Sequence, residues 1–110
     1  MGKIVNLEKI NSLKRQYVRQ GMEYIDRMNA VEPVIDRIVV FGSAITDDCT
    51  EESDVDLCIF SDYDESNDTY YEARGNLMHE IGDVCDILNF SYIGDDLKRT
   101  IEKGVTVYER

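Results

Sequence analysis

Three aspartates in this chain have the side-chain chemistry and the spacing of a metal-binding site. Asp54 and Asp56 open the run DVDLCIF, and Asp86 lies in the middle of a second run, VCDIL. Because successive side chains of a strand point to opposite faces, Asp54 and Asp56 share one face while the Val, Leu and Ile of their run share the other. Neighbouring carboxylates repel each other, and a divalent cation such as Mg²⁺, which takes oxygen ligands, relieves that repulsion. The pattern predicts a metal site with Asp86 as the third carboxylate, on a neighbouring strand.

A Gly-Ser pair precedes the first aspartate by ten residues. Gly42 and Ser43 end the apolar run IVVF. Glycine gives the backbone the freedom to turn and to approach a phosphate closely. Ser43 supplies a hydroxyl and an amide at the start of a short helical turn, where unpaired N–H groups favour anions. Ser43 alone could be no more than a helix N-cap, but the aspartates that follow at this spacing favour a phosphate-binding role.

The combination of Gly42-Ser43, ten residues, Asp54-x-Asp56 and a later strand aspartate, Asp86, resembles the DNA-polymerase-β-like nucleotidyltransferase superfamily. Its minimal nucleotidyltransferase branch is the most similar. The resemblance runs over residues 34–108 and implies an α+β fold, with a mixed sheet of about four strands and helices packed on one face. In one departure, the chain carries Thr46-Asp47 where many relatives have Arg-Gly shortly after the Gly-Ser pair.

The resemblance also implies a reaction. Asp54, Asp56 and Asp86 would hold two Mg²⁺ ions, or Mn²⁺, and Gly42 and Ser43 would bind the phosphates of ATP. AMP would pass to a hydroxyl acceptor, with Asp86 placed as general base. In this branch small stand-alone proteins often accompany an all-helical HEPN partner as antitoxin, and some transfer AMP to that partner's tyrosine.

Two other functions remain open at this point. The chain could be a non-catalytic antitoxin that neutralises its partner by occluding it, and the altered Thr46-Asp47 keeps that reading open. It could also modify a small molecule such as an aminoglycoside. Relatives with that activity carry additional sequence to hold the drug, so 110 residues disfavour it.

Length and charge limit the possibilities further. A chain of 110 residues predicts one domain, with an N-terminal helical segment at 1–33 and a catalytic core at 34–108. The net charge of −11 argues against a nucleic-acid substrate, because affinity for nucleic acid comes largely from Lys and Arg that neutralise phosphates. No apolar run is long enough to span a membrane and no secretory signal opens the chain, so we expect a cytoplasmic protein without membrane contact.

The apolar periodicity predicts the elements that must position the site. A long amphipathic helix is expected at 6–30, with Asn6 as its N-cap, followed by helices at 68–81 and 94–103. Strands are expected at 35–41, 54–60, 84–90 and 105–108, with the first two helices on one face of the sheet.

Several other chemically active side chains are expected to have structural or solvent-exposed positions. Cys49, Cys58 and Cys85 lack metal-binding spacing and are predicted to be free, buried thiols. His79 lies off the apolar stripe of its helix and is predicted to face solvent. Arg74 is expected to pair with Glu72 or Glu80 rather than to reach a triphosphate.

Overall fold

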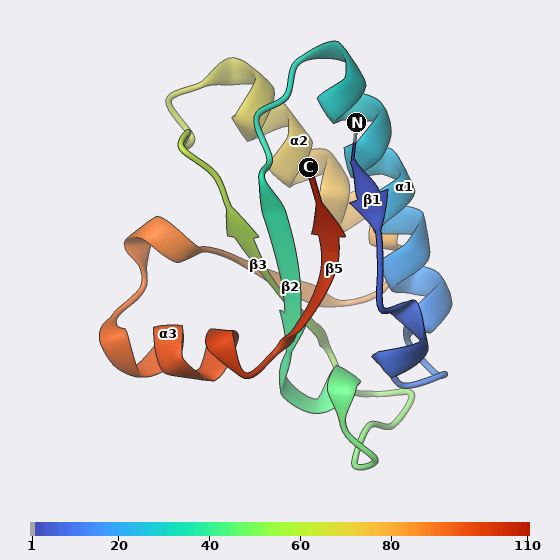
Figure 1. The fold of residues 1–110 in the computed structure, drawn as a ribbon. Helices are drawn as coiled ribbons and strands as arrows, with labels where there is room; N and C mark the ends of the chain where they lie inside the picture. The colour runs from blue at the N-terminus through green and yellow to red at the C-terminus, as the bar shows by residue number, and fades with distance from the viewer. Residues whose placement is uncertain (1) are drawn as a thin grey trace.

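The protein, described here by a computed structural model of residues 2–110, is built on a five-stranded mixed sheet (Figure 1). The strand order is β1-β5-β2-β3-β4. The strands are β1 (Lys3–Ile4), β2 (Arg37–Phe41), β3 (Val55–Phe60), β4 (Cys85–Asn89) and β5 (Val105–Glu109). The α-helices are α1 (Arg15–Val31), α2 (Asp68–Ile81) and α3 (Asp95–Glu102), and the 3-10 turns are η1 (Leu7–Lys9), η2 (Gly42–Ile45) and η3 (Phe90–Tyr92).

Among the described strands, β3 and β4 pair in parallel and every other neighbouring pair is antiparallel. Two parallel neighbours need a crossover connection, and α2 provides it. This helix has clear ends: Asn67 caps its first turn by accepting a hydrogen bond from the Tyr70 amide at 2.9 Å, and Gly82 ends it with a left-handed φ of 71°. The crossover brings the starts of β3 and β4 to the same level of the sheet, which is where the aspartates lie.

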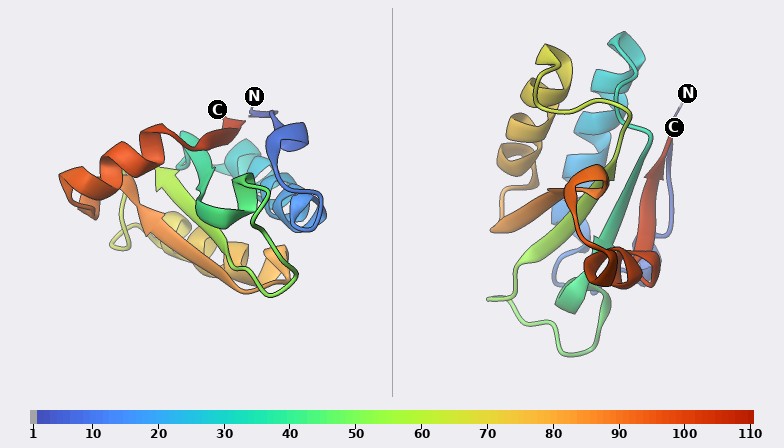
Figure 2. Two further views of the ribbon diagram at one scale, coloured as in Figure 1. Left: turned by 90° about the horizontal axis from the view of Figure 1, so that it is seen from below. Right: turned by 90° about the vertical axis from the view of Figure 1, so that its left-hand side faces the viewer.

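Helices α1 and α2 cover one face of the sheet, as the sequence predicts (Figure 2). Their buried side chains pack on the residues of β2 and β3 that point to this face. The side chains that pack together are Val18, Met22 and Ile25 of α1, Tyr70, Leu77 and Ile81 of α2, and Ile38, Val40, Leu57 and Ile59 of the sheet. Together they form the main hydrophobic core.

The opposite face of the sheet is covered only in part, by α3. Ile101 of this helix joins Val39, Phe41 and Cys58 in a smaller apolar cluster. Because side chains alternate along a strand, Cys58 and Asp56 point to the same face. The carboxylates therefore lie on the thinly covered side of the sheet, and the core lies behind them.

The predicted helix at 6–30 is wrong in its first third. Asn6 adopts a left-handed φ of 58° and does not cap a helix; its side-chain amide donates to Thr106 O of β5 at 2.9 Å. The preceding residues form β1, a fifth strand that the sequence did not reveal, and α1 begins only at Arg15. Arg15 donates to the carbonyls of Leu7 and Ile10 at 2.9 and 3.0 Å, so acceptors that a helix would have used internally are bound by a side chain.

The predictions for the three cysteines and for His79 are confirmed. All three cysteines are free and buried, and burial raises the pKa of the Cys58 thiol to about 11. His79 is exposed on α2. Within residues 2–110, no helix is both long and apolar enough to cross a membrane.

Candidate active site

Asp56 and Asp86 lie side by side at the start of the two parallel strands. In the sheet register, Phe41 of β2 is opposite Asp56 of β3, and Asp56 is opposite Asp86 of β4. Neighbouring strands are about 4.8 Å apart, and residues at matched positions point to the same face. Asp54 stands one residue before β3 and, by the same alternation, faces this side as well. The fold thus gathers the three predicted carboxylates at one end of the sheet.

The pKa of Asp56 reflects the proximity of the other two carboxylates. Its side chain is half-buried, whereas Asp54 and Asp86 are exposed. Partial burial is the largest factor that raises the pKa of the Asp56 carboxyl, and the charges of Asp86 and then Asp54 raise it further. The charges of Asp86 and Asp54 therefore disfavour ionisation of Asp56, and a bound cation would relieve this repulsion.

The Gly-Ser turn lies against the same carboxylate. Gly42 begins η2 with a left-handed φ of 76°, a backbone conformation that other residues rarely adopt. A β-carbon at Gly42 would lie 2.5 Å from Asp56 Oδ2. Glycine is required here both by the turn and by the carboxylate beside it. The space that the missing side chain leaves adjoins Asp56, where a phosphate or a cation would have to come close.

Thr46, at the position where many relatives have Arg, has a structural role in this chain. Its hydroxyl donates to Ser43 O at 3.0 Å and accepts a hydrogen bond from the Asp48 amide at 3.2 Å. The Thr46 amide also donates to Ser43 O, at 3.0 Å. The residue that departs from the family pattern therefore closes the turn that carries Ser43.

The three carboxylates fit a hard divalent cation by the chemistry of their oxygens. Carboxylate oxygens are its preferred ligands, and two adjacent strands present Asp56 and Asp86 at matched register. Among residues 2–110, no three His, Cys, Asp or Glu side chains converge into a ready-made metal-binding group. Asp54 and Asp86 are exposed, so packing does not fix their side chains, and a shared ion would require them to rotate toward it.

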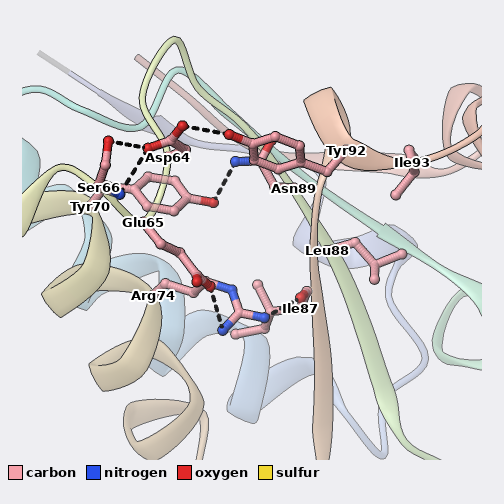
Figure 3. Close-up of a pocket in the computed structure, with 10 residues that line it drawn as sticks. All are labelled: Asp64, Glu65, Ser66, Tyr70, Arg74, Ile87, Leu88, Asn89, Tyr92 and Ile93. Atoms are coloured by element: carbon pink, nitrogen blue, oxygen red, sulfur yellow. Dashed lines mark hydrogen bonds and ion pairs between the residues drawn. The ribbon is translucent and has the colours of Figure 1, made fainter.

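A pocket that the sequence did not reveal lies along the outer edge of β4, where its lining begins at Ile87, the residue after Asp86 (Figure 3). Its volume is about 530 Å³. Aromatic and aliphatic side chains line it together with a few polar groups: Asp64, Glu65, Ser66, Tyr70, Arg74, Ile87, Leu88, Asn89, Tyr92 and Ile93. Asn89 donates to Tyr70 Oη at 2.8 Å, and the Tyr92 hydroxyl donates to Asp64 at 2.5 Å. These residues come from the loop before α2, from α2, from β4 and from η3 with the residue after it, so no local spacing could have identified them.

Arg74 lies in this pocket, and the predicted pairing with Glu72 or Glu80 is wrong. Its guanidinium donates to the carbonyl of Ile87 on the edge strand at 2.8 Å and lies 3.7 Å from the carboxylate of Glu65. The α2 backbone turns Arg74 toward β4, whereas the glutamates of its own helix face solvent. Arg74 thereby covers part of an edge strand that would otherwise present an unpaired carbonyl.

An α+β domain with a Gly-Ser turn and three aspartates at one end of its sheet has the architecture of a nucleotidyltransferase. The family model described as polymerase beta, nucleotidyltransferase matches residues 23–110, and the chain belongs to this family. A comparison with curated proteins found no match.

Solved structures with the same fold include toxin–antitoxin complexes. A crystal structure of the toxin–antitoxin MntA–HepT matches with a TM-score of 0.52 and 16% identity, over 80% of this chain and 69% of that one. A structure of a tri-AMPylated HEPN toxin from Shewanella oneidensis in complex with its MNT antitoxin gives 0.53 and 17%, over 80% and 69%. At these identities the likeness establishes the fold.

Proposed function

We propose that this protein is a Mg²⁺-dependent nucleotidyltransferase that moves AMP from ATP to a hydroxyl group of a HEPN-type partner protein and so acts as an antitoxin. The observation that carries the proposal is the matched register of Asp56 and Asp86, with Asp54 on the same face and Gly42 against the Asp56 carboxylate. Packing of the fold does not explain why three like charges stand together at one end of the sheet.

The residues have separable roles in this reaction. Asp54, Asp56 and Asp86 would hold two Mg²⁺ ions, which supply charge neutralisation at the phosphates and make the acceptor hydroxyl easier to deprotonate. The Gly42-Ser43 turn binds the terminal phosphates through its amides and the Ser43 hydroxyl. Asp86 accepts the proton of the hydroxyl. The acceptor oxygen forms a bond to the α-phosphorus as the bond from that phosphorus to pyrophosphate breaks.

The geometry of phosphoryl transfer indicates where the acceptor enters. The attacking and the leaving oxygens lie roughly in line on opposite sides of the phosphorus. The Gly42-Ser43 turn, which binds the leaving pyrophosphate, follows β2, so the acceptor approaches from the β4 side. β4 is an edge strand of the sheet, and the pocket lined by Leu88 and Tyr92 lies along it. The partner's hydroxyl would reach Asp86 across this edge.

The choice of a protein acceptor rests on charge and on the similar structures. The chain carries 23 acidic and 12 basic residues, which favours a basic protein partner over a nucleic acid. The similar structures include one whose HEPN toxin is AMPylated in complex with an MNT antitoxin, the same pair of components that we propose here.

Binding of ATP tests the site before any partner is known. Calorimetric titration should detect ATP with Mg²⁺ or Mn²⁺ present and lose the signal with excess chelator. Asp56→Asn should abolish binding, because it removes a central ligand, while Asp47→Asn in the exposed loop should leave it unchanged. Equal affinity with and without chelator would refute the metal-dependent site.

A further inference from the structure

The segment Asn11–Lys14, just before α1, contacts the Gly-Ser turn and the two loops that lead into β3 and β4. The Asn11 amide donates to Ala44 O at 2.8 Å and its side chain donates to Thr46 O at 2.9 Å, so Asn11 holds the turn at two points that follow Gly42-Ser43. Lys14 Nζ donates to Glu51 O at 2.9 Å, three residues before Asp54. One short segment therefore connects the turn to the loop that leads into β3.

Lys14 also reaches the loop that leads into β4. Its Nζ lies 2.7 Å from Asp83 Oδ2, three residues before Asp86. The other oxygen of Asp83 accepts a hydrogen bond from the Val84 amide at 2.8 Å, which fixes the backbone next to the strand. Lys14 therefore joins the loop that leads into β3 to the loop that leads into β4. The two strands pair in parallel, so both loops lie at the end of the sheet where the carboxylates stand.

The location of Lys14 is unfavourable on general grounds. Its side chain is 1% exposed, and burying an ammonium group is costly unless it is paired and hydrogen-bonded. It also stands at the N-terminus of α1, where the helix dipole disfavours a cation. A hydrophobic residue of similar size would fill the space without either cost. The two contacts with the entry loops are what a hydrophobic residue could not make.

We infer that Asn11 and Lys14 are positioning residues, which set the distance between the phosphate-binding turn and the metal-binding carboxylates. The inference deepens the proposed function and depends on it. Asn11 holds the turn that binds phosphates, and the Lys14–Asp83 pair holds the starts of β3 and β4 at the separation that lets Asp54, Asp56 and Asp86 share an ion.

The test uses Mn²⁺ alone as the probe, with free ion measured by electron paramagnetic resonance. The double variant Lys14→Met, Asp83→Asn removes both partners and leaves no unpaired buried charge. We expect it to fold and to bind Mn²⁺ about tenfold more weakly than the wild type, a typical effect of removing support behind metal ligands. The control is Arg99→Met with Asp96→Asn, an exposed ion pair of α3 whose loss also leaves the net charge unchanged.

Asn11→Ala gives a second, separable readout. We expect it to weaken binding of ATP with Mg²⁺ several-fold while Mn²⁺ binding without nucleotide stays within about twofold, because the Asn11 side chain bonds the turn and the nearby Leu13 amide, and neither of the loops that lead into β3 and β4. Thermal denaturation of each variant shows that it is folded at the assay temperature. If the folded Lys14→Met, Asp83→Asn variant binds Mn²⁺ as tightly as the control pair, the inference is wrong. If the wild type binds no Mn²⁺, the proposed metal site itself fails.

Discussion

Gly42 and Asp56 are packed so closely that a β-carbon on the glycine would lie 2.5 Å from the carboxylate oxygen. The contact connects the turn after β2 with the central aspartate of β3. Because of this contact, the charge state of the carboxylate affects the turn. Even the smallest substitution at position 42, Gly42→Ala, therefore tests the contact.

Gly42→Ala should destabilise the protein for two reasons, the left-handed φ of 76° and the contact with Asp56. Gly82 is the matched control, because it has a φ of 71° but nothing within 4 Å of an added β-carbon. We expect Gly82→Ala to lower the free energy of unfolding by about 1 kcal/mol, the usual strain of a left-handed non-glycine residue, and Gly42→Ala to lower it by more. Chemical denaturation measures both. Equal losses would show that the carboxylate contact does not constrain the turn.

Asp56→Asn should stabilise the protein in chelator at neutral pH. The pKa of Asp56 is raised above 3.8 in the folded state, so the folded protein resists ionisation of this group. The free energy of unfolding therefore falls as pH rises above 3.8, and the loss is complete above the folded-state pKa. The variant should melt a few degrees above the wild type at pH 7, and the difference should shrink as pH falls toward 3.8. Millimolar Mg²⁺ should stabilise the wild type and not the variant. A variant less stable than the wild type at pH 7 in chelator would contradict this electrostatic account.

Two buried tyrosines should respond differently to loss of their hydroxyl groups. Within the described chain, Tyr24 Oη is buried without a hydrogen-bond partner, whereas Tyr108 Oη accepts from Asn29 at 3.0 Å and donates to Asp26 at 3.2 Å. Tyr24→Phe should leave the free energy of unfolding unchanged or raise it, and Tyr108→Phe should lower it by about 1–2 kcal/mol. Urea denaturation compares the two. A larger loss for Tyr24→Phe would indicate that its hydroxyl is bound in solution.

The sheet and the carboxylates could be predicted from the sequence because each depends on a local pattern. Short apolar runs predicted β2, β3 and β4 within two residues at either end, and period-two alternation placed Asp54 and Asp56 on one face. The capping residue Asn67 and the left-handed Gly82 explain why α2 has the predicted bounds. Local signals of this kind do not require knowledge of which elements become neighbours.

The parts that could not be predicted depend on contacts between residues far apart in the sequence. Leu7 and Ile10 fit a helical stripe, but Asn6 pairs with Thr106 across almost the whole chain and forces a left-handed turn. The partners of Lys14 lie 37 and 69 residues away, so nothing in its neighbourhood distinguished it from the solvent-facing bases of α1. The edge pocket likewise depends on distant contacts, since Tyr92 of η3 bonds Asp64 in the loop before α2 and Asn89 of β4 bonds Tyr70 of α2.

The most direct test of the account is transfer to a partner protein. A HEPN-type protein would be incubated with this chain, ATP and Mg²⁺, and the intact mass of that protein measured. We expect the mass of one or more AMP groups to appear on the partner, to appear more slowly with Ser43→Ala, and to be absent with Asp54→Asn or Asp86→Asn. A partner of unchanged mass in the wild-type reaction, still neutralised by a variant that carries both Asp54→Asn and Asp86→Asn, would contradict the account and identify an occluding binding protein instead.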